Sequence, residues 1–231
     1  EAPKEVAKEF PADKAGLHVL FVPSEEPYHK RKVTLLNGPH TVLSPVAFLS
    51  GVNIVRDACN HEVISKYIHK VQFDELMQTL DLPMDELEKF AGDVLERFDN
   101  PFVDHQVTSI MLNSFPKFQA RDLPGVKTYL ERKGELPKGL VFGLAAIITY
   151  YKGGKRADGV EIVPNDDQKI MDLLKDLWAT GDTQKVADGV LGAEFIWAED
   201  LNKIQGLNAM VKQFLDLIQE KGMLEAVKTI L

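Results

Sequence analysis

Apolar side chains recur along most of the chain with the spacing of helices that bury one face. In the segment 84–98, this pattern is formed at positions i, i+3, i+4, i+7, i+8 and i+11 by Leu87, Phe90, Ala91, Val94, Leu95 and Phe98. The same spacing predicts helices over 61–80, 166–178 and 202–219. Each of these helices is expected to pack its apolar face against a shared core.

Helix-breaking residues separate the periodic segments and indicate short connections. Proline or glycine stands at 100–101, 122–125, 134–139, 152–159 and 181. The segment 16–23, GLHVLFVP, is short, β-branched and aromatic, which predicts a strand, whereas later strand signals are nearly absent. The pattern predicts an all-α, multi-helical fold of roughly nine or ten helices. We expect one helical domain over 1–231, with 1–28 as an extended lead-in or interdomain segment.

Composition narrows the class of partner. Of the 231 residues, 45% are hydrophobic, which is enough for a substantial core, and the net charge is −8. A negative protein repels nucleic-acid phosphates and anionic membrane surfaces, so we expect neither partner. The apolar run 139–151 is shorter than the roughly 20 residues of a bilayer-spanning helix, and it predicts a buried helix instead.

The single cysteine, Cys59, excludes an intramolecular disulfide and a Cys-x-x-Cys site, and it is typical of a reducing cytoplasm. The first residues, EAPKEVAKEF, contain no initiator methionine and no signal-peptide pattern. We therefore expect a cytoplasmic chain that is part of a longer protein.

Standard cofactor motifs are missing from the sequence. No two of the 16 glycines are two positions apart, so there is no G-x-G-x-x-G loop for a dinucleotide. The stretch GGKR lacks the other residues of a phosphate-binding P-loop, and there is no H-E-x-x-H zinc motif. The chain is not expected to bind NAD, ATP or a metal ion through such a motif of its own.

The segment 29–42, HKRKVTLLNGPHTV, places polar residues in an apolar helix. Lys32 and His40 lie on one ridge of residues four apart, and Asn37 is close to His40 around the helix, so the three side chains project over one arc. Gly38 and Pro39 predict a kink beside them. The three groups could converge on a small ligand.

A structural interpretation of the same residues also remains open. The Lys32 amine could reach water along its flexible stem, Asn37 could cap the helix that follows Pro39, and His40 could be a hydrogen-bonded core residue. A helical protein-interaction module without enzymatic activity is the corresponding alternative function.

The pattern Lys-x4-Asn-x2-His in RKVTLLNGPH resembles the signature of the long-chain polyol-specific dehydrogenases, the mannitol dehydrogenase family. The resemblance extends to LDLPMDELEKFAGDVLERFDNPFVDHQ and SIMLNSFPKF, covers about 16–121, and continues more loosely to the end. It implies the helical C-terminal substrate domain of an NAD-dependent secondary-alcohol dehydrogenase, preceded by a Rossmann domain that binds most of the NAD. The fragment alone is then expected to be inactive.

The resemblance assigns catalytic roles to the polar set. Lys32 is the implied general acid and base, Asn37 donates to the reacting oxygen, and His40 orients the substrate hydroxyl, so that no metal is implied. For Lys32 to lose its proton near neutral pH it should be desolvated, and we expect it to be buried against Val33 and Leu36.

The substrate class is suggested by a departure from the family pattern. Where mannitol-type members have an Asp-Gly-Ser-like stretch, this chain has LNSFPK, which favours members that act on uronates or aldonates. A carboxylate requires a cation, and Lys117 and Arg121 stand four apart close after His105 and Asn113, which makes these four the candidate substrate-binding residues. Alternatively, Lys117 and Arg121 form a solvated helix face. The alternative substrates are fructuronate, mannonate and mannitol.

Overall fold

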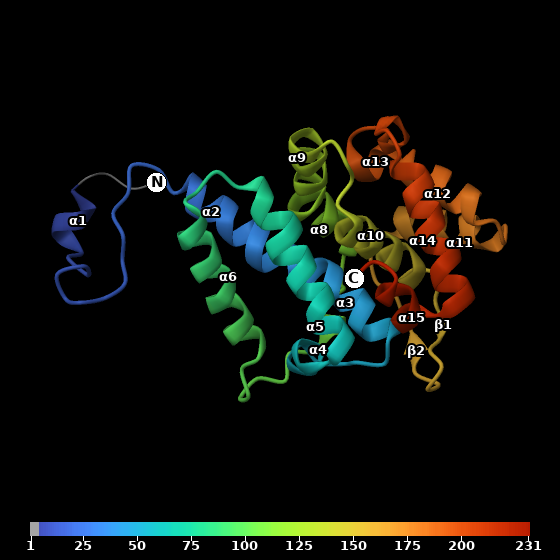
Figure 1. The fold of residues 1–231 in the computed structure, drawn as a ribbon, viewed down its shortest axis with the longest axis horizontal. Coiled ribbons are helices and arrows are strands. Elements are labelled where there is room, and N and C mark those ends of the chain that lie inside the picture. The colour runs from blue at the N-terminus through green and yellow to red at the C-terminus, as the bar shows by residue number, and fades with distance from the viewer. Residues whose placement is uncertain (1–4) are drawn as a thin grey trace.

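The computed structural model describes residues 5–231, and it is almost entirely helical (Figure 1). Its α-helices are α1 Val6–Glu9, α2 Glu26–Lys32, α3 Gly38–Leu49, α4 Val55–Asn60, α5 Glu62–His69, α6 Met84–Phe98, α7 Val107–Ile110, α8 Ser114–Arg121, α9 Leu123–Lys133, α10 Lys138–Tyr150, α11 Gln168–Ala179, α12 Thr183–Leu191, α13 Glu194–Trp197, α14 Leu207–Lys221 and α15 Met223–Lys228. The prediction of an all-α fold is confirmed. Nine of these helices have eight or more residues, and the other six are short segments that periodicity does not detect.

Several helices continue into tighter or wider turns. Two π-helical segments, η1 Val33–Asn37 and η2 Lys70–Leu76, follow α2 and α5, and two 3₁₀ segments are η3 Met77–Thr79 and η4 Leu201–Lys203. The helix predicted over 61–80 is therefore continuous but changes from α-helical to π-helical and then to 3₁₀-helical turns.

The strand predicted over 16–23 does not form within residues 5–231. Residues 17–22 have no strand partner within 5–231, and a β-strand exists only where a neighbour completes its hydrogen bonds. The one sheet in the described part is a hairpin of β1 Gly154–Lys155 and β2 Glu161–Ile162, with Gly154 opposite Ile162. It lies where the sequence predicted only a loop.

Helix α10 forms the centre of the core, as its apolar run predicts. All of its residues from Gly139 to Tyr150 are buried, and it packs against α3 and α14. In the part of the chain that the structure describes, no helix has both the length and the apolar character needed to cross a bilayer.

The path α2–η1–α3 carries the polar set and contains the expected irregularity. It is a π turn and not an open kink, and its cause is Pro39, which has no N–H to offer the carbonyl of Leu35 four residues earlier. The Gln72 side-chain amide takes that place, because its Nε2 donates to the Leu35 oxygen at 2.8 Å. Gln72 is fully buried.

Replacing Gln72 with leucine should lower the free energy of unfolding by about 1–2 kcal/mol, because the buried Leu35 and Ala91 carbonyls would both lose the Gln72 amide as a donor. Gln78→Leu is the matched control, since its amide also donates to a backbone carbonyl, that of Phe73, but is only half-buried. Urea unfolding of both variants measures the difference. Equal stabilities would refute this role of Gln72.

Candidate active site

The π turn places Lys32 and His40 on the same side of the helix. Lys32 ends α2 and His40 lies in the first turn of α3. Eight residues make roughly 2.2 turns of a regular α-helix. A π turn contains nearly one residue more than an α turn, so the rotation about the helix axis from Lys32 to His40 is closer to two full turns. Asn37 is the last residue of the π turn itself.

His40 lies at the centre of the site. Its ring stacks on Phe98 of α6, with centroids 3.8 Å apart and planes 10° from parallel. Its Nε2 is buried and has no hydrogen-bond partner within residues 5–231. Burial lowers the pKa of His40 to about 3, and the charges of His105, Arg121 and Lys32 act in the same direction. The imidazole is therefore neutral at physiological pH.

This shift predicts how stability depends on pH. Below 6.5 the unfolded chain protonates His40 while the folded chain does not, so its contribution to stability is lost as the pH falls from 6.5 towards about 3. Between pH 6.5 and 5 the expected loss is at most about 2 kcal/mol. Urea unfolding of the native chain and of His40→Gln between pH 6.5 and 5 measures this contribution of His40. If the free energies of unfolding of the two proteins fell in parallel with pH, the contribution would be refuted.

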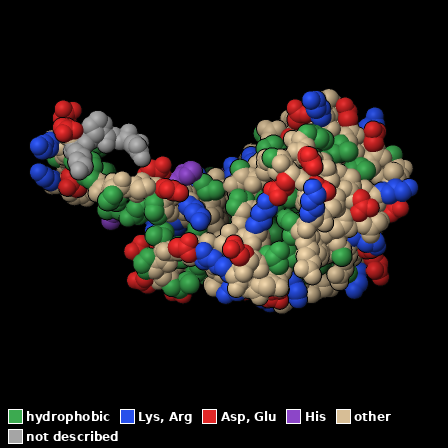
Figure 2. Space-filling view, turned by 90° about the horizontal axis from the view of Figure 1, so that it is seen from above, with side chains coloured by type: hydrophobic (Ala, Val, Ile, Leu, Met, Phe, Trp, Pro, Cys, Tyr) green, Lys and Arg blue, Asp and Glu red, His purple; other side chains and the backbone are tan. Residues whose placement is uncertain are grey.

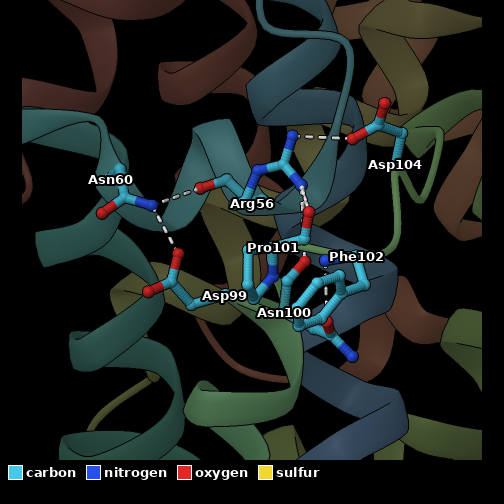
Figure 3. Close-up of polar contacts among 7 residues, drawn as sticks. All are labelled: Arg56, Asn60, Asp99, Asn100, Pro101, Phe102 and Asp104. Carbon is cyan, nitrogen blue, oxygen red and sulfur yellow. Dashed lines mark hydrogen bonds and ion pairs between the residues drawn. The ribbon is translucent and has the colours of Figure 1, made fainter.

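His105 reaches the site from a loop whose contacts with Arg56 are shown in Figure 3. The Arg56 Nη1 donates to the Pro101 carbonyl at 2.9 Å, and its Nη2 forms an ion pair with Asp104 at 2.6 Å. The amide of Val55 donates to the His105 carbonyl at 2.9 Å. The His105 ring then lies edge-on to His40, with centroids 5.5 Å apart.

Figure 3 also shows the second support of this loop. The side-chain amide of Asn60 donates to Asp99 and to the Arg56 carbonyl, so α4 holds the end of α6 and the start of the loop together. The Phe102 amide donates to the Asn100 side chain, which shapes the turn. His105 is therefore positioned by backbone and side-chain contacts although its own side chain is exposed.

Arg121 joins the site from the end of α8. Its Nη1 donates to the Thr41 hydroxyl at 3.2 Å, and that hydroxyl donates to the Asn37 carbonyl at 2.8 Å. Burial lowers the pKa of Arg121, against the opposing charge of Asp122. This guanidinium remains protonated at any physiological pH, so it supplies a fixed positive charge beside His40.

Lys117 and Asn113 lie beside the group formed by His40, His105 and Arg121 and are not part of it. The Lys117 Nζ donates to the Ile110 carbonyl at 2.7 Å, and its pKa is lowered by burial and then by Arg121. Asn113 precedes α8 in the left-handed conformation, and its amide donates to the Asn165 carbonyl. Within residues 5–231 no hydrogen bond joins Asn113 to His40 or Arg121.

The expected burial of Lys32 is wrong for this chain. Lys32 is exposed, and its neighbour Val33 is half-buried at the edge of the core. The α2 helix that carries it has no buried residue, so the ridge that was expected to desolvate the amine is itself open. Its charge makes the smallest of the contributions that lower the pKa of His40.

Three residues of the site were not identified from the sequence. Phe98 was assigned only to the core, and Thr41 gave no signal. Asp122 is fully buried, and neither carboxylate oxygen has a hydrogen-bond partner in the described part of the chain. Its burial raises the pKa well above the ordinary value, against the charge of Arg121. A Cβ at Gly38 would lie 2.9 Å from its Oδ1, so only glycine fits there.

The arrangement combines an ammonium group, a guanidinium group, a neutral imidazole and a side-chain amide around one place. The Oδ1 of Asn37 is buried without a partner within residues 5–231, as is the Nε2 of His40. The fixed positive charge of Arg121 favours an anionic ligand, and the uncharged groups can orient its hydroxyls. The described residues contain no group of three His, Cys, Asp or Glu placed to hold a metal ion.

Comparison with known proteins gives the same fold and related sequences. The family model described as the mannitol dehydrogenase C-terminal domain matches residues 25–219. The altronate oxidoreductase of Bacteroides thetaiotaomicron is 82% identical over 231 residues, which are all of this chain and 48% of that protein. The altronate oxidoreductase of Bacillus subtilis is 38% identical over 230 residues, 99% of this chain and 46% of that protein. The chain thus spans about half the length of these relatives.

Among solved structures, a mannitol 2-dehydrogenase of Pseudomonas fluorescens in a ternary complex with NAD and D-mannitol aligns with a TM-score of 0.82 and 21% identity. The alignment covers 94% of this chain and 43% of that one. A substrate-free D-sorbitol dehydrogenase aligns with a TM-score of 0.78 and 22% identity. At these identities the likeness establishes the fold.

Proposed function

Because the chain belongs to the family of mannitol dehydrogenase C-terminal domains, we propose that it is the helical half of an NAD-dependent oxidoreductase that interconverts D-altronate and D-tagaturonate in hexuronate catabolism. The other half is proposed to be a Rossmann domain that precedes it, which would account for the additional length of the curated relatives. We call the complete molecule the two-part protein.

The observations that carry this proposal are the edge-on contact of His105 with His40 and the hydrogen bonds that link Arg121 through Thr41 to the Asn37 carbonyl. These residues come from η1, α3, the α6–α7 loop and α8, so only the fold brings them together. The relatives named altronate oxidoreductase at 82% and 38% identity support the substrate class.

The nicotinamide cofactor does not fit the residues present here. The chain has no glycine-rich loop, so its binding is assigned to the proposed Rossmann domain. When bound, NAD would supply the acceptor for the hydride of the carbinol carbon. No contact of this chain with the cofactor is part of the proposal.

The residues of this chain would move the proton and hold the oxygen. Because Lys32 is exposed in this chain, the proposal requires the remaining half of the two-part protein to desolvate its amine so that it can lose its proton. In altronate oxidation the deprotonated amine then takes the proton of the reacting hydroxyl, and in the reverse direction the ammonium group returns it. The Asn37 amide donates to the same oxygen as negative charge develops there. Neutral His40, held by its stack on Phe98, hydrogen-bonds a hydroxyl and fixes its orientation.

The substrate carboxylate is proposed to bind Arg121. The Nη1 of Arg121 donates to the Thr41 hydroxyl, which orients the guanidinium group, and its other N–H groups can donate to a carboxylate. Lys117 lies one turn before it on α8 and adds positive charge. A neutral polyol has no group that needs the Arg121 cation, which favours a uronate or aldonate over mannitol.

The test is steady-state kinetics of the two-part protein with altronate, mannonate and mannitol. We expect kcat/KM to be highest for altronate, with NAD reduction followed by absorbance, and we expect the 231-residue chain alone to be inactive. A preference for mannitol would reject the uronate assignment. Turnover by the 231-residue chain would reject the two-part arrangement.

A further inference from the structure

The first described residues form an arm that stands away from the helical body (Figures 1 and 2). The arm comprises 5–25, with α1 near its start and an extended segment over 17–22. Large apolar side chains on it are exposed, namely Phe10, Leu17, Leu20, Phe21 and Val22. Leu20 is 71% exposed and Phe21 46%. So much apolar surface on one short segment marks an interaction site.

The extended segment has the composition of a strand that is covered on both faces. With a repeat of two, Leu17, Val19 and Phe21 fall on one face, and His18, Leu20 and Val22 fall on the other. Five of the six residues are apolar, so neither face suits water. Strands with this pattern occur in sheets that have helices packed on both sides.

The backbone of the segment lacks the hydrogen bonds of a strand. Leu17 and Val19 donate only to carbonyls inside the arm, those of Ala12 and Leu17. Within residues 5–231 the amides of Leu20, Phe21 and Val22 have no backbone partner. Unpaired amides beside exposed apolar side chains form an edge that can receive another strand.

The comparisons indicate which molecule supplies the partner strand. The family model begins at residue 25, so the arm lies outside the helical domain that it describes. The relatives nevertheless match this chain from end to end, and they are about twice as long. A segment that is retained among relatives but separate from the helical domain belongs with the remaining half.

We propose that residues 17–22 form a β-strand in a sheet of the proposed Rossmann domain, joined by backbone hydrogen bonds and covered on both faces. This inference rests on the two-part protein of the proposed function. The arm is then a shared element that fixes the helical domain to its partner, because the same backbone continues without a break from the strand into α2 and Lys32.

Hydrogen exchange of the two-part protein tests the proposal. The amides of residues 17–22 should exchange roughly 100-fold more slowly, or slower still, than in the 231-residue chain. Leu20→Asp should reduce this protection at least about 10-fold, because a charge would enter a covered face. The matched control is Phe195→Asp on α13, which is 58% exposed but outside the arm, and it should leave the protection unchanged.

The outcomes separate this inference from the proposed function. Fast exchange of 17–22 in an active two-part protein would overturn the strand and leave the activity standing. Protection that appears in the 231-residue chain and rises with its concentration would show pairing with a second copy and would also overturn the proposal. Protection in a two-part protein without altronate oxidation would support the strand while the proposed function fails.

Discussion

Replacing Lys32 with alanine in the two-part protein is expected to lower kcat/KM for altronate oxidation by a factor of about 10² to 10⁴, which is the usual contribution of a positioned general base. The hydroxyl proton must leave as the hydride departs, and alanine has no group to accept it. Lys32→Arg should be almost as inactive, because an arginine side chain stays protonated and cannot act as a base.

The fold should survive both changes at Lys32. Its side chain is exposed, and α2 has no buried residue, so urea unfolding should be unchanged within about 0.5 kcal/mol. Lys30→Ala, at another exposed lysine of α2, is the matched control and should keep its activity. Equal activity of Lys32→Ala and Lys30→Ala would show that the proton is moved by another group and would refute the assignment.

The exposure of Lys32 shows where sequence patterns stop being informative. Periodicity predicted α6 with its observed bounds and predicted α10 as a buried helix, because in both the apolar residues of the segment itself decide the outcome. Burial of the Lys32 amine depends instead on what packs against α2 from outside. The apolar neighbours Val33 and Leu36 on the same helix were not sufficient to predict whether the Lys32 amine is buried.

The site itself was predictable only in part. The spacing of Lys32, Asn37 and His40 suggested that they share one side of a helix, but in a regular helix Lys32 and His40 would be turned apart, and the π turn corrects this. The cause of the turn, Pro39, is visible in the sequence. The hydrogen bond from the Gln72 amide to the Leu35 carbonyl is not visible there, because nothing in the sequence around Gln72 indicates this contact.

The contribution of Arg121 was proposed from charge and spacing alone. The structure adds the Thr41 hydroxyl, which links the guanidinium to the backbone of the π turn. Lys117 was given the same role, but its amine is bonded to the Ile110 carbonyl. Two cations four residues apart on one helix thus have different surroundings, which the sequence does not distinguish.

The largest expected effect on stability lies where α10 crosses α3, directly behind the site. A Cβ at Gly143 would lie 2.4 Å from the Cβ of Val42 and 2.8 Å from the Tyr67 hydroxyl oxygen. Tyr67 is fully buried, its hydroxyl donates to the Gly139 carbonyl, and Val42 is also fully buried, so neither neighbour can move freely. The two helices must therefore separate to admit a methyl group.

Gly143→Ala should lower the free energy of unfolding by about 1–3 kcal/mol, the usual cost of overpacking a core, even though alanine is the better helix former. Gly92→Ala on α6 is the matched control, because no atom lies within 4 Å of a Cβ there, and it should raise stability by up to about 1 kcal/mol. Urea unfolding of both variants measures the sign of each change in the free energy of unfolding. If both were stabilising, the close packing of α10 on α3 would be refuted, and with it the rigid support that holds α3 and His40 in place.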